Sequence, residues 1–155
     1  MKPLDLINSA NFLANASRGR PNQVYLRRAT SAAYYALFHC LAQNCANLLV
    51  GNTKAFISEA AWRQVYRGLD HGTAKRACRQ QTVSRFPAEV INFASQFAIM
   101  QEKRHEADYD PHVRLTKSEV LADIEMTAEA IRVFQNASTK DRRAFAVFVL
   151  LKSRT

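Results

Sequence analysis

The sequence predicts an all-α fold of about five helices followed by a C-terminal extension. Apolar residues recur at helical spacing along the chain, and no segment shows the sustained alternation of β-branched residues that marks a strand. The 155 residues include only 4 glycines and 4 prolines, and 48% of them are hydrophobic, which favours a folded domain with few tight turns. No internal repeat or linker divides the chain.

The first two predicted helices are joined by a short loop. One helix runs from about Leu4 to Ser17 and ends before residues 18–22, where glycine and proline interrupt the pattern. Asn22 can cap the second helix, which runs to about Val50. Because this helix is apolar over most of its circumference, we expect a central helix buried on several sides, or one also used in an oligomer interface.

Shorter segments follow in the middle of the chain. Ser58 can cap a third helix that carries Trp62 and Tyr66. Residues 70–73 predict a turn, because a glycine lies among short polar residues. Residues 74–81 predict a short basic helix or an ordered loop.

Two longer helices follow. Pro87 opens a fourth helix over about 88–107, and Asp110 before a proline ends it, because the residue before proline is pushed out of the α region. Thr116, with a glutamate three residues later, forms a capping box for a fifth helix. The bundle is expected to span residues 1–136.

Residues 137–155 are expected to form a basic amphipathic extension. This segment alternates basic residues with Phe145, Phe148 and branched apolar residues. Two interpretations follow: a terminal helix docked on the bundle, or an exposed amphipathic element that joins a partner.

Charge and cysteine content narrow the function classes. The net charge is +9, from 22 basic and 13 acidic residues, which favours a polyanionic partner such as RNA, although solubility alone can explain some excess. No apolar run approaches the roughly 20 residues of a membrane span and no secretion signal is seen, so a cytoplasmic protein is expected. Cys40, Cys45 and Cys78 match no metal spacing and are expected to be reduced, structural thiols.

The segment 104–111 holds the densest group of reactive side-chain types. On a helix, Arg104 neighbours Asp108 and His105 neighbours Tyr109. An arginine fork can hold phosphate oxygens and a histidine can move protons near neutral pH, which suits metal-independent cleavage of RNA by its own 2′-OH. The alternative is a surface ion pair and a polar contact at a helix end. Neither a metal site nor a cofactor is expected, since metal-ligand spacings and Gly-rich phosphate loops are missing from the sequence.

A second polar and aromatic group lies on the second predicted helix. Arg28, Ser31, Tyr35 and His39 follow three- and four-residue spacing and can share one face. They are candidate substrate-binding residues. The alternative is an aromatic core strip whose polar tips find partners within the protein.

Together these segments resemble the HEPN superfamily. The run from Arg27 to His39 is similar to the RRA-x-S-x-AYYA-x-FH signature of its small bacterial members, and the run from Arg104 to Pro111 is similar to their late R-x-x-ADYDP motif. The likeness covers roughly residues 4–136. It implies a HEPN-like antiparallel helical bundle, usually a homodimer, in which the late motifs of the two subunits face each other in a cleft.

The resemblance also implies a toxin or phage-defence ribonuclease, often paired with a nucleotidyltransferase antitoxin. The catalytic motif of the family places a histidine five residues after an arginine, and these positions are Arg104 and Tyr109 here. Under this interpretation Arg104 stabilises the phosphorane, His105 assists proton transfer or orients the RNA, and Asp108 and Tyr109 position it. His105 or His112 could stand in for the missing histidine. The alternative is a non-catalytic HEPN module that binds RNA, a nucleotide or a nucleotidyltransferase partner.

Overall fold

The computed structural model describes residues 1–154, and this part of the chain contains helices and no strand, which confirms the all-α prediction. None of these helices combines the length and the apolar character that a membrane span requires. In chain order the elements are α1 (Pro3–Ala14), α2 (Gln23–Leu49), α3 (Glu59–Gly68), α4 (His71–Cys78), the 3-10 helix η1 (Gln81–Arg85), α5 (Ala88–Tyr109), α6 (Lys117–Gln135) and α7 (Thr139–Leu150). The described residues therefore form seven α-helices rather than about five.

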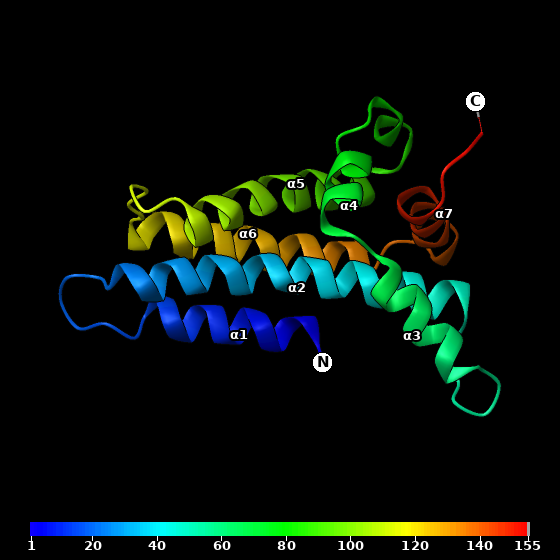
Figure 1. Ribbon diagram of the computed structural model, residues 1–155, viewed down its shortest axis with the longest axis horizontal. Helices are drawn as coiled ribbons and strands as arrows, with labels where there is room; N and C mark the ends of the chain where they lie inside the picture. Colours follow the sequence, from blue (N-terminus) through cyan, green and yellow to red (C-terminus); the bar gives the residue numbers. More distant parts are fainter. Residues whose placement is uncertain (155) are drawn as a thin grey trace.

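The central element is α2. It runs along the long axis of the molecule, with α1 on one side and α5 and α6 on the other (Figure 1). It also contacts α3 and α7. Ala29, Ala33 and Ala36 are fully buried, and their small side chains let neighbouring helices approach closely. The prediction of a central helix buried on several sides is confirmed.

Side-chain caps set the start of five helices. The side chains of Asn22, Ser58, Asp70, Thr116 and Ser138 each accept a hydrogen bond from a backbone N–H in the first turn of α2, α3, α4, α6 and α7, respectively. Such caps satisfy donors that the helix itself leaves free. The predicted caps at Asn22, Ser58 and Thr116 are confirmed.

The predicted turn at residues 70–73 is wrong. Asp70 Oδ1 accepts a hydrogen bond of 2.8 Å from the Thr73 N–H, and α4 begins at His71. The cap compensates for Gly72 in the first turn, so glycine does not end the helix here. His71 therefore lies in a helix that packs on α5, and not in a loop.

The start of the chain also differs from its prediction. Helix α1 ends at Ala14, three residues before the predicted end at Ser17. The side-chain amide of Asn15 donates to the Asn11 carbonyl at 2.8 Å and so takes up an acceptor at the helix end.

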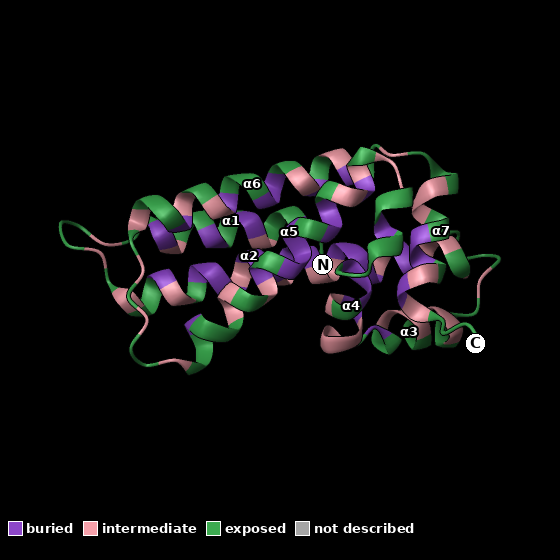
Figure 2. Cartoon of the chain, turned by 90° about the horizontal axis from the view of Figure 1, so that it is seen from above, coloured by how far each residue is buried: buried purple, intermediate pink, exposed green. Residues whose placement is uncertain are grey.

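The last helix shares the hydrophobic core. Phe145 is fully buried, and its ring lies against those of Phe86, Phe93, Phe134 and Phe148. Buried residues line the inner faces of the helices, α7 included, and exposed residues line the outer faces (Figure 2). The interpretation of the C-terminal segment as a docked helix is therefore confirmed.

The three cysteines are buried, free thiols. Burial raises the pKa of Cys40, Cys45 and Cys78 to about 12, so all three stay protonated near neutral pH. This placement agrees with the predicted structural role, because the thiolate is the reactive form.

Replacing Phe145 should test how far α7 contributes to the core. We expect Phe145→Ala to lower the free energy of unfolding by about 3–5 kcal/mol, because a fully buried ring leaves a cavity. Phe12→Ala is the matched control, since that ring is 75% exposed, and should change stability by less than about 0.5 kcal/mol. Urea denaturation followed by circular dichroism gives both values. Equal effects of the two substitutions would contradict the docked position of α7.

Candidate functional site

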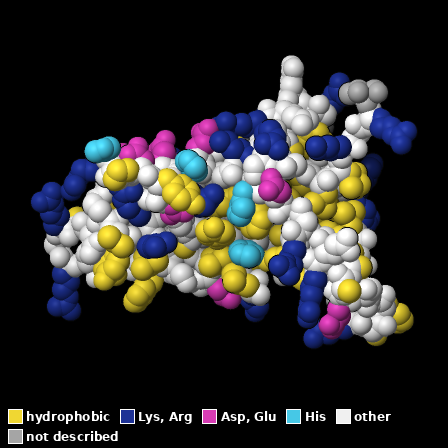
Figure 3. Space-filling view, in the orientation of Figure 1, with side chains coloured by type: hydrophobic (Ala, Val, Ile, Leu, Met, Phe, Trp, Pro, Cys, Tyr) yellow, Lys and Arg dark blue, Asp and Glu magenta, His cyan; other side chains and the backbone are white. Residues whose placement is uncertain are grey.

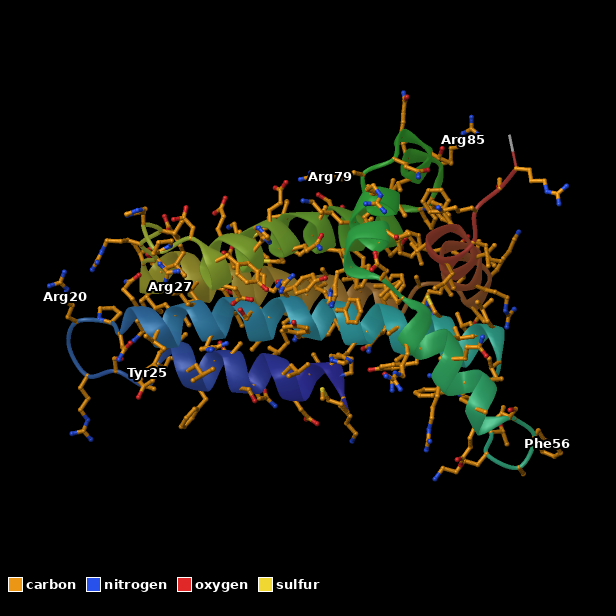
Figure 4. The ribbon with its side chains drawn as sticks, viewed as in Figure 1. Arg20, Tyr25, Arg27, Phe56, Arg79 and Arg85 are labelled. Carbon is orange, nitrogen blue, oxygen red and sulfur yellow. The ribbon has the colours of Figure 1, made fainter. Side chains whose placement is uncertain are left out.

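The two motif segments are joined by Arg27, near the start of α2. Its guanidinium donates to the backbone carbonyls of Ala107 at 2.8 Å, Asp110 at 2.7 Å, Pro111 at 3.4 Å and Val113 at 2.5 Å. These carbonyls lie at the end of α5 and just beyond it, where a helix leaves acceptors unpaired. Figure 4 shows Arg27 where α2 passes the end of α5. Arg27 therefore holds the late motif against the early one.

Of the side chains near Arg27 on α2, Gln23 binds the loop after α5, whereas Arg28 is exposed. The Gln23 side chain donates to the Leu115 carbonyl at 2.8 Å and accepts from the Leu115 N–H at 2.9 Å, which adds a second link to the same loop. Arg28, the candidate substrate-binding arginine, is exposed. Sequence reasoning missed Arg27 and Gln23 as positioning residues, because their partners lie some 80 to 92 positions away in the chain.

Arg104 and Asp108 form the predicted pair on α5 and face α2. Arg104 Nη1 lies 3.4 Å from Asp108 Oδ2, and Ser31 Oγ donates to Asp108 Oδ1 at 2.5 Å. The two charged side chains are only 12% and 20% exposed, so solvent screens this pair less than an ordinary surface ion pair. Ser31 and Asp108 thus fix one side of the Arg104 guanidinium.

The rings of Tyr34 and Tyr35 lie on the other side of the Arg104 guanidinium. Arg104 Cζ lies 5.2 Å from the centroid of the Tyr34 ring and 5.8 Å from that of Tyr35, within cation–π range. Its Nε is buried without a hydrogen-bond partner among the described residues. Because Nε is shielded from solvent, an oxyanion cannot reach it without movement of its neighbours. Nη2, which forms no hydrogen bond with a described residue and is not among the buried, unpartnered atoms, is the donor open to an oxyanion.

His105 and Tyr109 lie apart from this pair, on the exposed side of α5. Their ring centroids are 4.9 Å apart, as the four-residue spacing predicts. A surface pocket of about 390 Å³ lies beside Tyr109, between α2 and the end of α5. It is lined by Val24, Arg27, Arg28, Ala107, Asp108 and Tyr109. Arg28 is thereby close to two of the candidate catalytic residues.

His71, at the first position of α4, contacts the same tyrosines as Arg104. Its Nδ1 lies 2.6 Å from Tyr34 Oη, and its ring stacks on Phe38 with centroids 3.9 Å apart. Its centroid lies 5.9 Å from that of Tyr35. Sequence reasoning assigned His71 to a loop and missed it; the Asp-x-x-Thr spacing of the Asp70 cap was the available signal.

The remaining candidate, His39, lies further along α2. Its Nδ1 is 2.5 Å from Tyr66 Oη, and Tyr66 stacks on Trp62 with centroids 5.0 Å apart. The rings form a continuous aromatic strip over α2: Tyr34, Tyr35, Phe38, His39, Trp62, Tyr66 and His71. The four candidate substrate-binding residues are therefore spread along one face of α2 rather than gathered in one cluster.

Burial changes the acidity of several rings in this strip. The pKa of His71 is lowered from its ordinary value of 6.5, first by burial and then by the Arg104 charge, against a smaller opposing effect of Asp70. Burial, together with the N-terminal amino group, lowers the pKa of His39. Burial also raises the pKa of Tyr34, so its phenol keeps its proton. Both lowered pKa values favour the neutral imidazole at neutral pH.

Among residues 1–154, no group of three or more His, Cys, Asp or Glu side chains is placed to hold a metal ion. Comparison of the chain with protein-family models, with curated proteins and with solved structures found no match.

Arg27→Met should show whether the link to the end of α5 holds the late motif. The substitution keeps the apolar stem and removes all four hydrogen bonds, so we expect a loss of about 2 kcal/mol in the free energy of unfolding. Arg28→Met, one residue away and exposed, should change stability by less than about 0.5 kcal/mol. Hydrogen exchange should quicken at residues 107–113 in Arg27→Met alone. Unchanged exchange there would contradict the link.

The lowered pKa values predict a loss of stability in acid. The unfolded chain protonates His71 near pH 6.5, whereas the folded protein protonates it only at lower pH. Between these values the unfolded state binds more protons, so the free energy of unfolding falls as the pH falls from about 6.5 towards the folded pKa. Urea titrations between about pH 7 and pH 5 should show a smaller fall in His71→Gln than in the wild type. Identical pH dependence in both proteins would contradict the lowered pKa.

Proposed function

We propose that this protein is a HEPN-type ribonuclease that cleaves RNA without a metal ion, in a toxin–antitoxin or phage-defence system. The observation that carries the proposal is the position of Arg104, which is nearly buried, is held by Asp108 and two tyrosine rings, and has no hydrogen bond from Nη2 to a described residue. A guanidinium held in this way can stabilise the added charge of a phosphorane with little reorganisation. The family resemblance supplies the reaction class.

The other residues of the late motif fit supporting roles. Asp108 positions Arg104, and Ser31 positions Asp108. Tyr109 is 67% exposed and lines the pocket beside Arg28, so it can stack on a base of a bound RNA strand. His105 lies against Tyr109 and would orient the RNA at the same edge.

The charge distribution suits a polyanionic substrate. On the face drawn in Figure 3, the histidines near the middle lie among hydrophobic side chains, Asp and Glu side chains lie along the upper edge, and Lys and Arg side chains gather towards both ends. Several arginines of α3, α4 and η1 form no ion pair with a described carboxylate: Arg67, Arg76 and Arg85. Such side chains attract phosphate groups and make RNA binding weaken as salt rises.

The proposal includes a homodimer and a nucleotidyltransferase antitoxin, both implied by the resemblance. Val24 and Tyr109 are 61% and 67% exposed and line the same pocket. Their exposure supports the binding of a partner molecule over this part of the surface. Large apolar side chains gathered at one exposed site favour contact with another molecule. In the dimer the two copies of Arg104 would face one cleft.

A second candidate function is a non-catalytic HEPN module that binds RNA or a nucleotidyltransferase partner. The observation that favours it is Tyr109, which stands at the usual histidine position. A phenol with a reference pKa of about 10 is a poor proton acceptor at neutral pH. This alternative predicts RNA binding without cleavage.

An RNA cleavage assay in EDTA separates the two functions. The wild type should cleave at least one of tRNA, ribosomal RNA and messenger RNA, and Arg104→Ala should lower the rate by about 10²–10³-fold, because the phosphorane loses its charged donor. Arg104→Lys keeps the charge without the planar fork and should remain well below the wild type. Tyr109→Phe should cleave within a few-fold of the wild type.

Absence of cleavage by pure wild type on all three RNA classes would overturn the ribonuclease proposal. Retained RNA binding in that case, measured by fluorescence anisotropy, would favour the non-catalytic module.

A further inference from the structure

We infer that His71 is the group that accepts the 2′-OH proton during RNA cleavage, so that the catalytic site is built from α4 and α5 above α2. This inference rests on the proposed ribonuclease function and deepens it. The family resemblance places the proton-transfer histidine within the late motif. His71 lies outside that motif.

Arg104 and His71 both lie near the rings of Tyr34 and Tyr35. The Tyr34 ring centroid lies 5.2 Å from Arg104 Cζ and 5.6 Å from the His71 ring centroid. The Tyr35 ring centroid lies 5.8 Å and 5.9 Å from the same two groups. Arg104 and His71 therefore flank the same pair of rings from different helices. A cation for the phosphate and an imidazole for the hydroxyl proton lie within one small region.

The contacts of the His71 ring leave its Nε2 available to accept a proton. Its Nδ1 contacts the Tyr34 phenol at 2.6 Å, and its ring is held flat on Phe38. No described residue forms a hydrogen bond with its Nε2, and that atom is not among the buried, unpartnered ones. In the tautomer that carries its proton on Nδ1, the Nε2 lone pair is free to accept a proton from a substrate.

The other three histidines lack this placement. His105 is exposed and lies against Tyr109 rather than against the tyrosines that flank Arg104. His39 also has a phenol at Nδ1, that of Tyr66, but its ring lies beside Tyr35 and not beside Tyr34, so it faces only one of the two rings that flank Arg104. His112 lies in the exposed loop after α5.

The chemical step balances within the site and the substrate. His71 Nε2 accepts the proton of the ribose 2′-OH as O2′ forms a bond to phosphorus, and Arg104 donates to the non-bridging oxygens. The P–O5′ bond then breaks and O5′ takes a proton from water, which leaves a 2′,3′-cyclic phosphate and a 5′-hydroxyl. The imidazolium returns its proton to solvent.

The charged and titratable groups around His71 fix the direction of its pH dependence. Arg104 faces it from α5, His39, Tyr34 and Tyr35 face it from α2, and Asp70 precedes it on its own helix. Burial and Arg104 favour the neutral ring, whereas Asp70 favours the charged one. Because neutral imidazole is the reactive form, kcat/KM should rise with pH and level off above a pKa lower than 6.5.

The test compares histidine variants of the full chain in EDTA with a cleavable RNA. We expect His71→Gln to lower kcat/KM by about 10²–10⁴-fold and to abolish the acidic limb of its pH profile, with RNA affinity changed by less than about threefold. His112→Gln removes the other histidine considered as a proton acceptor, and loss of the acidic limb in this variant would assign the role to His112 instead of His71. The products of the wild type should carry 2′,3′-cyclic phosphate ends.

The outcomes distinguish the inference from the function it rests on. Absence of cleavage by the wild type overturns the ribonuclease proposal itself. Cleavage by the wild type and by folded His71→Gln with the same acidic limb overturns the role of His71 and leaves the ribonuclease standing. If His71→Gln does not fold, the NMR titration of His71 in the wild type decides: a midpoint that differs from the kinetic pKa overturns the assignment.

Discussion

The candidate site depends on one guanidinium, that of Arg27, bound to four backbone carbonyls at the end of α5. The end of a helix leaves such carbonyls unpaired and is prone to fray, so a site placed there needs an external restraint. Arg104 and Asp108 lie in the last turns of α5, immediately before the restrained loop. The early and late motifs are thus two parts of one interaction: the first supplies the arginine, and the second supplies the carbonyls.

A second constraint is the cost of holding Arg104 away from water. A nearly buried cation is expensive unless charge and hydrogen-bonding partners compensate for lost hydration. Asp108 supplies an opposite charge, and the faces of Tyr34 and Tyr35 supply the negative side of an aromatic quadrupole. Ser31 in turn holds Asp108. The arrangement fixes the guanidinium within the protein, and under the proposed function this preorganisation would stabilise charge that develops on the phosphate.

Local contacts could be predicted from the sequence, and contacts between distant segments could not. The pairing of Arg104 with Asp108 follows from helical geometry, because residues four apart share a face. The caps and the central position of α2 follow equally from local residue types and from apolar periodicity. The acceptors of Arg27 lie 80 to 86 positions away, and no periodicity encodes such a pairing. The helical placement of His71 was not predicted, because Gly72 among short polar residues is typical of a turn, whereas the Asp70 side chain caps a helix there.

The position of Tyr109 on α5 explains why, under the proposed mechanism, the proton acceptor would come from α4. Tyr109 is exposed on α5, so a histidine there would face solvent and would need another molecule to complete its surroundings. His71 is held by its own chain, because Phe38 and Tyr34 fix its ring. Under the proposed mechanism, one subunit therefore contains both the phosphate-binding cation and the proton acceptor. Dimerisation would then govern how RNA is gripped around Tyr109, whereas the reacting groups would be assembled by the packing of α4 and α5 on α2.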